Sequence, residues 1–118
     1  MIEPHTHPNA AELNYVIHGK VRFTVFGTSG QVAISGIGKG QIFVVPAGYF
    51  HYLENPYNMG GGTVASFFNN ENPEFIGIAG GLSSYSNETL GSVFNKDSRF
   101  FSTLPRIQKN VFIASGTG

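Results

Sequence analysis

The chain contains no cysteine and no tryptophan, and only 12% of its 118 residues are charged. Without cysteine, no disulfide can hold the fold and no thiolate can bind a metal, so the redox compartment is left undecided. The seven basic residues balance the seven acidic ones, and no basic cluster indicates nucleic-acid binding. No apolar run reaches about 18 residues, so no membrane span is expected. The first residues show neither the basic start nor the apolar stretch of a signal peptide.

Apolar residues are abundant for so little charge, and phenylalanine alone occurs 11 times. A chain of this length forms one domain, residues 1–118, around one core. Apolar surface in excess of that core would be buried between subunits, which predicts a homo-oligomer. The alternative is that the core of a β-barrel simply uses many aromatic side chains.

Short apolar stretches separated by turn residues predict an all-β fold. The expected strands cover residues 13–18, 21–26, 31–37, 41–45, 51–54 and 63–68. Gly19-Lys20 and Thr28-Ser29-Gly30 are turn signals between them, and residues 56–62 are expected to form a loop. Many short strands with regular turns indicate a sandwich or barrel, with residues 1–73 as its body.

The tail, residues 74–118, follows a different pattern. Residues 75–79 predict one further strand. Residues 87–94 and 100–104 then carry apolar side chains at helical spacing, the first after a cap at Ser86 or Asn87 and the second before Pro105. Two short helices are not stable alone, so we expect them to pack on a barrel, either their own or a neighbour's.

Three of the four histidines lie in two segments with strand and turn patterns. His5 and His7 are two residues apart, so on a strand both imidazoles project from one face. Glu12 follows at the start of an apolar run, and His51 follows a tight turn at residues 46–48. These four residues are the candidate ligands of one metal ion.

Imidazole and carboxylate ligands without thiolate suit manganese, iron, nickel, copper or zinc. Three neutral imidazoles and one carboxylate leave a divalent ion with net positive charge, which attracts small anions. A six-coordinate ion would keep two positions for water, dioxygen or substrate, as a redox or Lewis-acid catalyst needs. A closed structural zinc site is the alternative. His18, beside Gly19 at a turn, is interpreted as an ordinary residue outside the site.

Strand parity places Asn14 on the same inner face as Glu12. There Asn14 could hydrogen-bond a metal-bound water or a substrate oxygen; the alternative is an ordinary polar strand residue. Three phenylalanines are candidates for an apolar wall around the site, or simply for the core: Phe43, Phe50 and Phe67.

The two histidine segments resemble the two sequence motifs of the cupin superfamily. The pattern His-x-His, four residues, Glu, six residues, Gly runs from His5 to Gly19. The pattern Gly, five residues, Pro-x-Gly, two residues, His, three residues, Asn runs from Gly40 to Asn55. This resemblance implies an antiparallel jelly-roll barrel with two short C-terminal helices. It also implies a metal inside the barrel, bound by His5, His7, Glu12 and His51.

Within the superfamily the chain looks most like the germin-like branch, over residues 3–107. Germin-like proteins are typically secreted, oligomeric manganese proteins with oxalate oxidase or superoxide dismutase activity. The resemblance therefore implies a manganese cofactor, a small carboxylate or oxygen species as substrate, an extracellular location and a homo-oligomer. Asn87-Glu88-Thr89 also matches the N-glycosylation pattern. The rival hypothesis is a non-enzymatic storage, wall or coat protein in which the metal is structural.

The chain departs from the germin pattern before its first histidine. Oxalate-oxidising germins carry an asparagine three positions before that histidine, and oxalate decarboxylases an arginine, whereas this chain has Ile2. Only residues 1–4 precede His5, so the usual upstream strands are expected to be lacking and the sheet edge beside His5 to be unpaired. We therefore expect either a homo-oligomer with tail helices packed across its interface, or an upstream segment that covers this edge.

Overall fold

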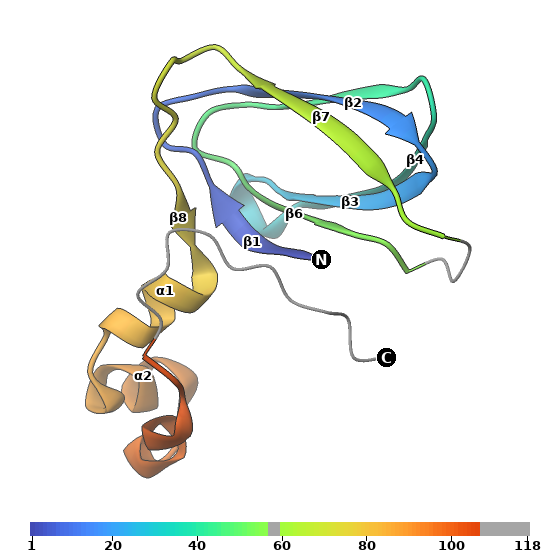
Figure 1. Ribbon diagram of the computed structural model, residues 1–118. Helices are drawn as coiled ribbons and strands as arrows, with labels where there is room; N and C mark the ends of the chain where they lie inside the picture. The colour runs from blue at the N-terminus through green and yellow to red at the C-terminus, as the bar shows by residue number, and fades with distance from the viewer. Residues whose placement is uncertain (57–59, 107–118) are drawn as a thin grey trace.

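Two antiparallel sheets form the body of the protein in a computed structural model that describes residues 1–56 and 60–106 (Figure 1). The strands are β1 (Ile2–Thr6), β2 (Glu12–His18), β3 (Lys20–Phe26), β4 (Val32–Gly38), β5 (Ile42–Val45), β6 (Phe50–Glu54), β7 (Thr63–Phe68) and β8 (Ile76–Gly77). One sheet has the order β4-β3-β6-β1-β8 and the other β5-β2-β7. The all-β prediction is confirmed. The described strands form a two-sheet jelly roll, and no ladder joins the two sheets into a closed barrel.

The predicted strands of the body all form, with ends that differ by no more than one residue from the expected ones. The turn between β2 and β3 depends on Gly19, which has a φ of +74°. A side chain there would collide with the carbonyl oxygen of Gly61, and this left-handed conformation favours glycine in any case. Part of the predicted loop at 56–62 lies outside the described residues.

The prediction of an unpaired sheet edge beside His5 is wrong. β1 lies between β6 and β8, and His5 is in register with His51 on one side and Gly77 on the other. The chain itself supplies the covering strand, because residues after Pro73 return alongside β1. The buried carboxylate of Glu3 then accepts a hydrogen bond of 2.8 Å from the backbone N–H of Ala79, which attaches the start of the tail to β1.

The tail contains one more helix than predicted. Residues 75–79 were expected to be a strand, but β8 has only two residues and α1 (Ile78–Ser84) begins directly after it. The sequence Gly80-Gly81 conceals this helix, because glycine has a low helix propensity. The two predicted helical patterns form as α2 (Asn87–Phe94) and the 3-10 helix η2 (Ser98–Thr103). Ser86 caps α2 by accepting from the N–H of Thr89.

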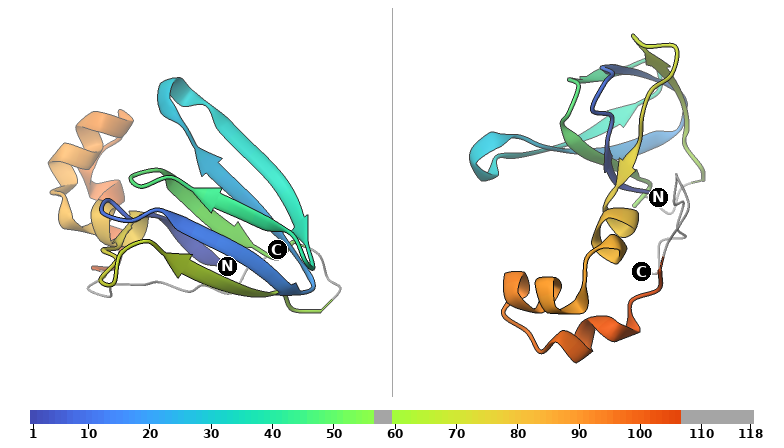
Figure 2. Two further views of the ribbon diagram at one scale, coloured as in Figure 1. Left: turned by 90° about the horizontal axis from the view of Figure 1, so that it is seen from above. Right: turned by 90° about the vertical axis from the view of Figure 1, so that its left-hand side faces the viewer.

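The helices extend away from the sheets instead of covering them (Figures 1 and 2). Phe101 of η2 lies 5.7 Å from Phe94 of α2 between ring centroids, so these two helices pack on each other. The two helices were expected to pack on a barrel, either their own or a neighbour's. In the described part of the tail they do not pack on their own sheets, so packing on a neighbour stays a prediction; residues 107–118 lie outside the described part. No helix of the described chain is long and apolar enough to cross a membrane.

Candidate metal centre

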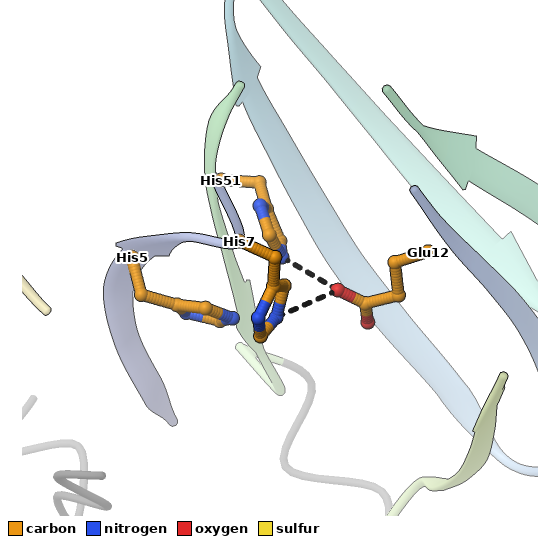
Figure 3. Close-up of side chains that lie close together, drawn as sticks. All are labelled: His5, His7, Glu12 and His51. Atoms are coloured by element: carbon orange, nitrogen blue, oxygen red, sulfur yellow. Dashed lines mark hydrogen bonds and ion pairs between the residues drawn. The ribbon is translucent and has the colours of Figure 1, made fainter. Parts of the chain in front are cut away.

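Four polar side chains, carried by three strands and the residues beside them, meet between the two sheets (Figure 3). His5 lies on β1, His7 just after it, Glu12 is the first residue of β2, and His51 lies on β6. All four are buried, and one nitrogen or oxygen atom of each lies within 4.8 Å of the others. The structure thus brings together every residue that the sequence predicted as a ligand. His18 lies exposed at the far end of β2, outside this group.

The local structure explains why these residues converge. His5 and His51 are directly opposite each other on neighbouring strands, so their rings project from the same face. Their ring centroids are 4.2 Å apart. The turn that precedes β6 places Gly48 at a φ of +83°, and its N–H donates to the carbonyl of His7 over 2.9 Å. This bond ties the two ligand-bearing segments together.

Backbone carbonyls fix the orientation of each imidazole. The Nδ1 atoms of His5 and His7 lie 2.7 Å from the carbonyl oxygens of Glu3 and Glu74, and that of His51 lies 3.0 Å from the carbonyl oxygen of Tyr49. A carbonyl oxygen only accepts hydrogen bonds, so each Nδ1 must carry the proton. In a neutral ring, Nε2 then carries the lone pair.

The Nε2 atoms of two of these rings face the same carboxylate oxygen. Oε2 of Glu12 lies 2.9 Å from Nε2 of His51 and 3.2 Å from Nε2 of His7 (Figure 3). Lone pairs that face each other at this distance repel unless a positive charge lies between them. The cluster therefore requires a cation, either a proton or a metal ion. Three imidazole nitrogens and one carboxylate oxygen fit a first-row transition metal.

The electrostatics of the cluster favour the forms of His5 and Glu12 that bind a metal. Burial lowers the pKa of His5 to about 4, the Glu3 carbonyl opposes this effect, and the neighbouring His51 and His7 add to it. Burial would raise the pKa of Glu12, but the hydrogen bond and charge of His51 hold it below its usual value. At neutral pH, His5 is thus a neutral imidazole and Glu12 a carboxylate, as metal binding requires.

Two phenylalanine rings cover the histidines. Phe75 stacks on His5 with the ring centroids 4.5 Å apart and the planes 18° from parallel. Phe68 meets His7 edge-on at 4.8 Å and 70°. These rings limit the access of water to the cluster.

The predicted aromatic wall was mostly wrong. Phe50 and Phe67 are 38% and 57% exposed, and only Phe43 points inward, where it packs on Phe23 at 3.9 Å. Phe68 could have been found by pairing, since it is in register with Glu12 on the neighbouring strand. No local pattern in the sequence indicates Phe75, because it reaches the cluster from the tail.

Asn14 lies on the inner face of β2, two residues beyond Glu12, and is 1% exposed. The hydroxyl of Ser66 donates to its Oδ1 over 2.5 Å, which fixes the orientation of the amide. Its Nδ2 has no hydrogen-bond partner in the described structure. The Asn14 amide also contributes to the lowered pKa of Glu12, so it faces that carboxylate without a hydrogen bond of normal geometry.

Comparisons with known proteins identify the family of the chain. The sequence profile of the cupin family matches residues 1–100. Germin-like protein 11-1 of Oryza sativa subsp. japonica is 36% identical over 75 residues, which are 64% of this chain and 33% of that protein. Germin-like protein 3-8 of the same organism is 30% identical over 110 residues, 92% of this chain and 48% of that protein. The chain thus spans between a third and a half of the length of these relatives.

Solved structures share the same fold. The oxalate decarboxylase of Bacillus subtilis, determined at pH 4.6, superposes with a TM-score of 0.81 and 25% sequence identity. The superposition covers 98% of this chain but only 30% of that enzyme. The cupin-type jelly roll expected from the two histidine segments is therefore confirmed.

Proposed function

The chain belongs to the cupin family, and from this premise we propose that it is a germin-like metalloprotein that binds one manganese ion through His5, His7, Glu12 and His51. The observation that carries this proposal is the convergence of the Nε2 lone pairs on the Glu12 carboxylate, because that geometry requires a cation. Manganese is the first choice among the metals that suit the ligand set. A Bacillus subtilis oxalate decarboxylase of the same fold has Mn(II) centres.

The proposed chemistry is an oxidoreductase reaction on a small carboxylate or on superoxide. In the second case, two superoxide anions and two protons give dioxygen and hydrogen peroxide. A bound manganese ion would supply the redox change and a positive charge for the anion. The protein holds the three imidazoles by their carbonyl bonds and provides Glu12 as the only anionic ligand. Phe68 and Phe75 exclude bulk water from the histidines.

Nδ2 of Asn14 is a buried donor beside the cluster, and it has no hydrogen-bond partner in the described structure. A buried N–H without a partner costs about 1–3 kcal/mol, so such a group in a native protein calls for a ligand. We assign Asn14 to hydrogen-bonding an oxygen atom of water or substrate next to the metal. Its Oδ1 is occupied by Ser66, which leaves Nδ2 as the donor.

A structural role for the metal is the second candidate. Ile2 stands where the oxalate enzymes of the superfamily have a polar substrate-binding residue, and Phe75 lies flat on His5. A storage or wall protein with a closed metal site would have both features. The two functions differ in whether small anions reach the metal.

Metal analysis followed by spectroscopy tests the proposal. The purified protein should contain one manganese per chain, and the variant Glu12→Gln should contain far less. Oxalate or azide should change the electron paramagnetic resonance spectrum of the bound Mn(II), and the protein should dismutate superoxide or consume oxalate. An unchanged spectrum and no activity would favour the structural role, whereas a chain that retains no metal under any loading condition refutes both.

We also propose that the protein acts outside the cell, as the germin-like resemblance implies, and that Asn87 carries an N-glycan. Asn87 is the first residue of α2 and lies partly exposed on the part of the tail that extends from the sheets. Expression through a secretory pathway should give a product whose mass falls after deglycosylation, and Asn87→Gln should abolish this difference.

A further inference from the structure

Residues 74–79 reach the metal centre from the start of the tail, and we name them the cover segment. The carbonyl oxygen of Glu74 lies 2.7 Å from Nδ1 of His7. The ring of Phe75 stacks on His5 with the centroids 4.5 Å apart. Two of the three imidazoles in the cluster therefore depend on this segment, one for its orientation and the other for its cover.

The backbone ladder attaches the cover segment to the sheet over a short distance. β8 has two residues, and it pairs with β1 where Ile76 lies opposite Thr6 and Gly77 lies opposite His5. Strands in globular proteins are usually three to ten residues long, so this ladder provides few hydrogen bonds. Contacts at the two ends of the segment therefore decide how firmly it lies on the cluster.

Glu3 holds the end of the cover segment that leads into α1. The residue is 4% exposed, and its Oε2 accepts a hydrogen bond of 2.8 Å from the N–H of Ala79. No side chain of the tail caps α1, so this bond from β1 satisfies one of the free N–H groups of its first turn. A Cβ atom at Gly77 would collide with the carboxylate, so glycine leaves the space that Glu3 occupies.

Asn9 holds the other end of the cover segment. Its Oδ1 accepts a hydrogen bond of 2.8 Å from the N–H of Glu74, and its Nδ2 donates to the carbonyl oxygen of Asn72 over 3.1 Å. Nδ2 of Asn70 in turn donates to the carbonyl oxygen of Asn9 over 3.1 Å. These bonds fix the turn before the cover segment to the turn that follows His7.

We infer that Glu3 and Asn9 are positioning residues of the metal centre. They hold the cover segment in place, and the segment in turn orients His7 and covers His5. Neither belongs to the four candidate ligands, so each acts through the segment. The inference rests on the proposed metal site, but the contacts belong to the chain itself and are measurable without a metal.

Nuclear magnetic resonance of the metal-free protein tests the Asn9 end. A ring N–H that is bonded to a carbonyl exchanges slowly with water and gives a resolved signal. Asn9→Ala should abolish the Nδ1–H signal of His7, because the carbonyl beside it is no longer held. His51 is the internal control, since its Nδ1 lies 3.0 Å from the carbonyl oxygen of Tyr49, outside the cover segment. Its signal should persist.

The same spectra test the Glu3 end. Glu3→Ala should move the ring-proton signals of His5 downfield, because the stacked ring of Phe75 shields these protons and would be released. Glu3→Gln keeps an acceptor oxygen and should stay close to the parent signals. Should Glu3→Ala fold poorly, Gly77→Ala tests the same contact from the other side, because its Cβ displaces the carboxylate, and it should give the same downfield shift.

Metal titration measures the consequence for the site. Manganese affinity should fall about tenfold or more in Glu3→Ala and in Asn9→Ala, as is typical when a group that orients a metal ligand is lost. Glu71→Ala is the matched control, because Glu71 is exposed in the turn before the cover segment and lies outside the cluster. This control should bind manganese as tightly as the parent protein does.

Two results would overturn the inference. One is that the signals of His5 and His7 in the variants equal those of the parent protein. The other is that the His51 signal is lost together with them, because the two residues would then support the fold in general. A parent protein that binds no metal refutes the proposed function instead, and the spectra of the metal-free chain still decide whether Glu3 and Asn9 hold the cover segment.

Discussion

The inner and outer faces of β2 both depart from the usual rule that polar side chains are exposed and apolar side chains are buried. Glu12 and Asn14 are polar but buried on the inner face, whereas Leu13 and Tyr15 are apolar but exposed on the outer face. Burying an uncompensated charge, or exposing a large apolar patch, is unfavourable. The inner face therefore needs a cation, whereas the outer face leaves contiguous apolar surface exposed.

Removing the Glu12 charge from the inner face should give the largest loss of metal affinity. Glu12→Gln keeps the shape of the side chain but takes away the only anionic ligand, so manganese affinity should fall at least about 100-fold, more than the loss of a supporting residue costs. Isothermal titration calorimetry on metal-free protein measures this change. Glu71→Gln is the matched control, because Glu71 is exposed and outside the cluster. Equal affinities of the two variants would contradict a ligand role for Glu12.

Acid should destabilise the metal-free protein through the inner face. The pKa of His5 falls from 6.5 to about 4 on folding, so below pH 6.5 the unfolded chain binds a proton that the folded chain does not. The folded state is therefore most stable, as far as His5 is concerned, above pH 6.5, and its free energy of unfolding falls as the pH drops towards 4. Between pH 6.5 and about 5, the free energy of unfolding should drop by about 2 kcal/mol from this residue.

Urea denaturation at a series of pH values measures this slope. His5→Asn should flatten the pH dependence over this range, while the exposed control His18→Asn should leave it unchanged. A His5→Asn profile with the same slope as the parent protein would show that another group causes the acid sensitivity.

Removing the Asn14 amide from the inner face should lower metal or anion affinity less than the Glu12 change does, and it should not lower stability. Asn14→Leu takes away an amide that has an unpaired Nδ2, so the metal-free protein should be as stable as the parent or slightly more stable. The affinity for manganese, or for azide on the manganese protein, should nevertheless fall about tenfold. Thermal unfolding and anion titrations measure the two quantities. A loss of stability with unchanged anion affinity would indicate an ordinary structural residue.

Changing the outer face of β2 should leave metal binding at its inner face unchanged. Leu13→Ser, one residue from Glu12 but on the opposite side of β2, should change metal affinity by less than about twofold, because its side chain points away from the four side chains of the cluster. Metal titration of this variant beside the parent protein measures the effect. A large loss of metal affinity would mean that the two faces are coupled.

The strands of the body and the four candidate metal ligands were predictable because their signals are local. Alternation places His5 and His7 on one side, and glycine and proline mark the turns that bring Glu12 and His51 towards them. Asn14 followed from the same parity. The helix α1 was missed because Gly80-Gly81 weakens its local signal, and only its attachment to Glu3 and β8 accounts for it.

The sequence by itself determined the two-sheet fold class, the candidate ligand set and the inward side of β2, since each follows from local patterns of strands, turns and histidine spacing. Only the tertiary structure decided which groups surround the cluster: the Glu74 carbonyl on His7, and the Phe75 ring on His5, come from nearly 70 residues away. It also decided that β8 covers the edge beside His5 and that the face of β5, β2 and β7 remains open. Those outcomes depend on how distant strands pair, and no local pattern carries that information.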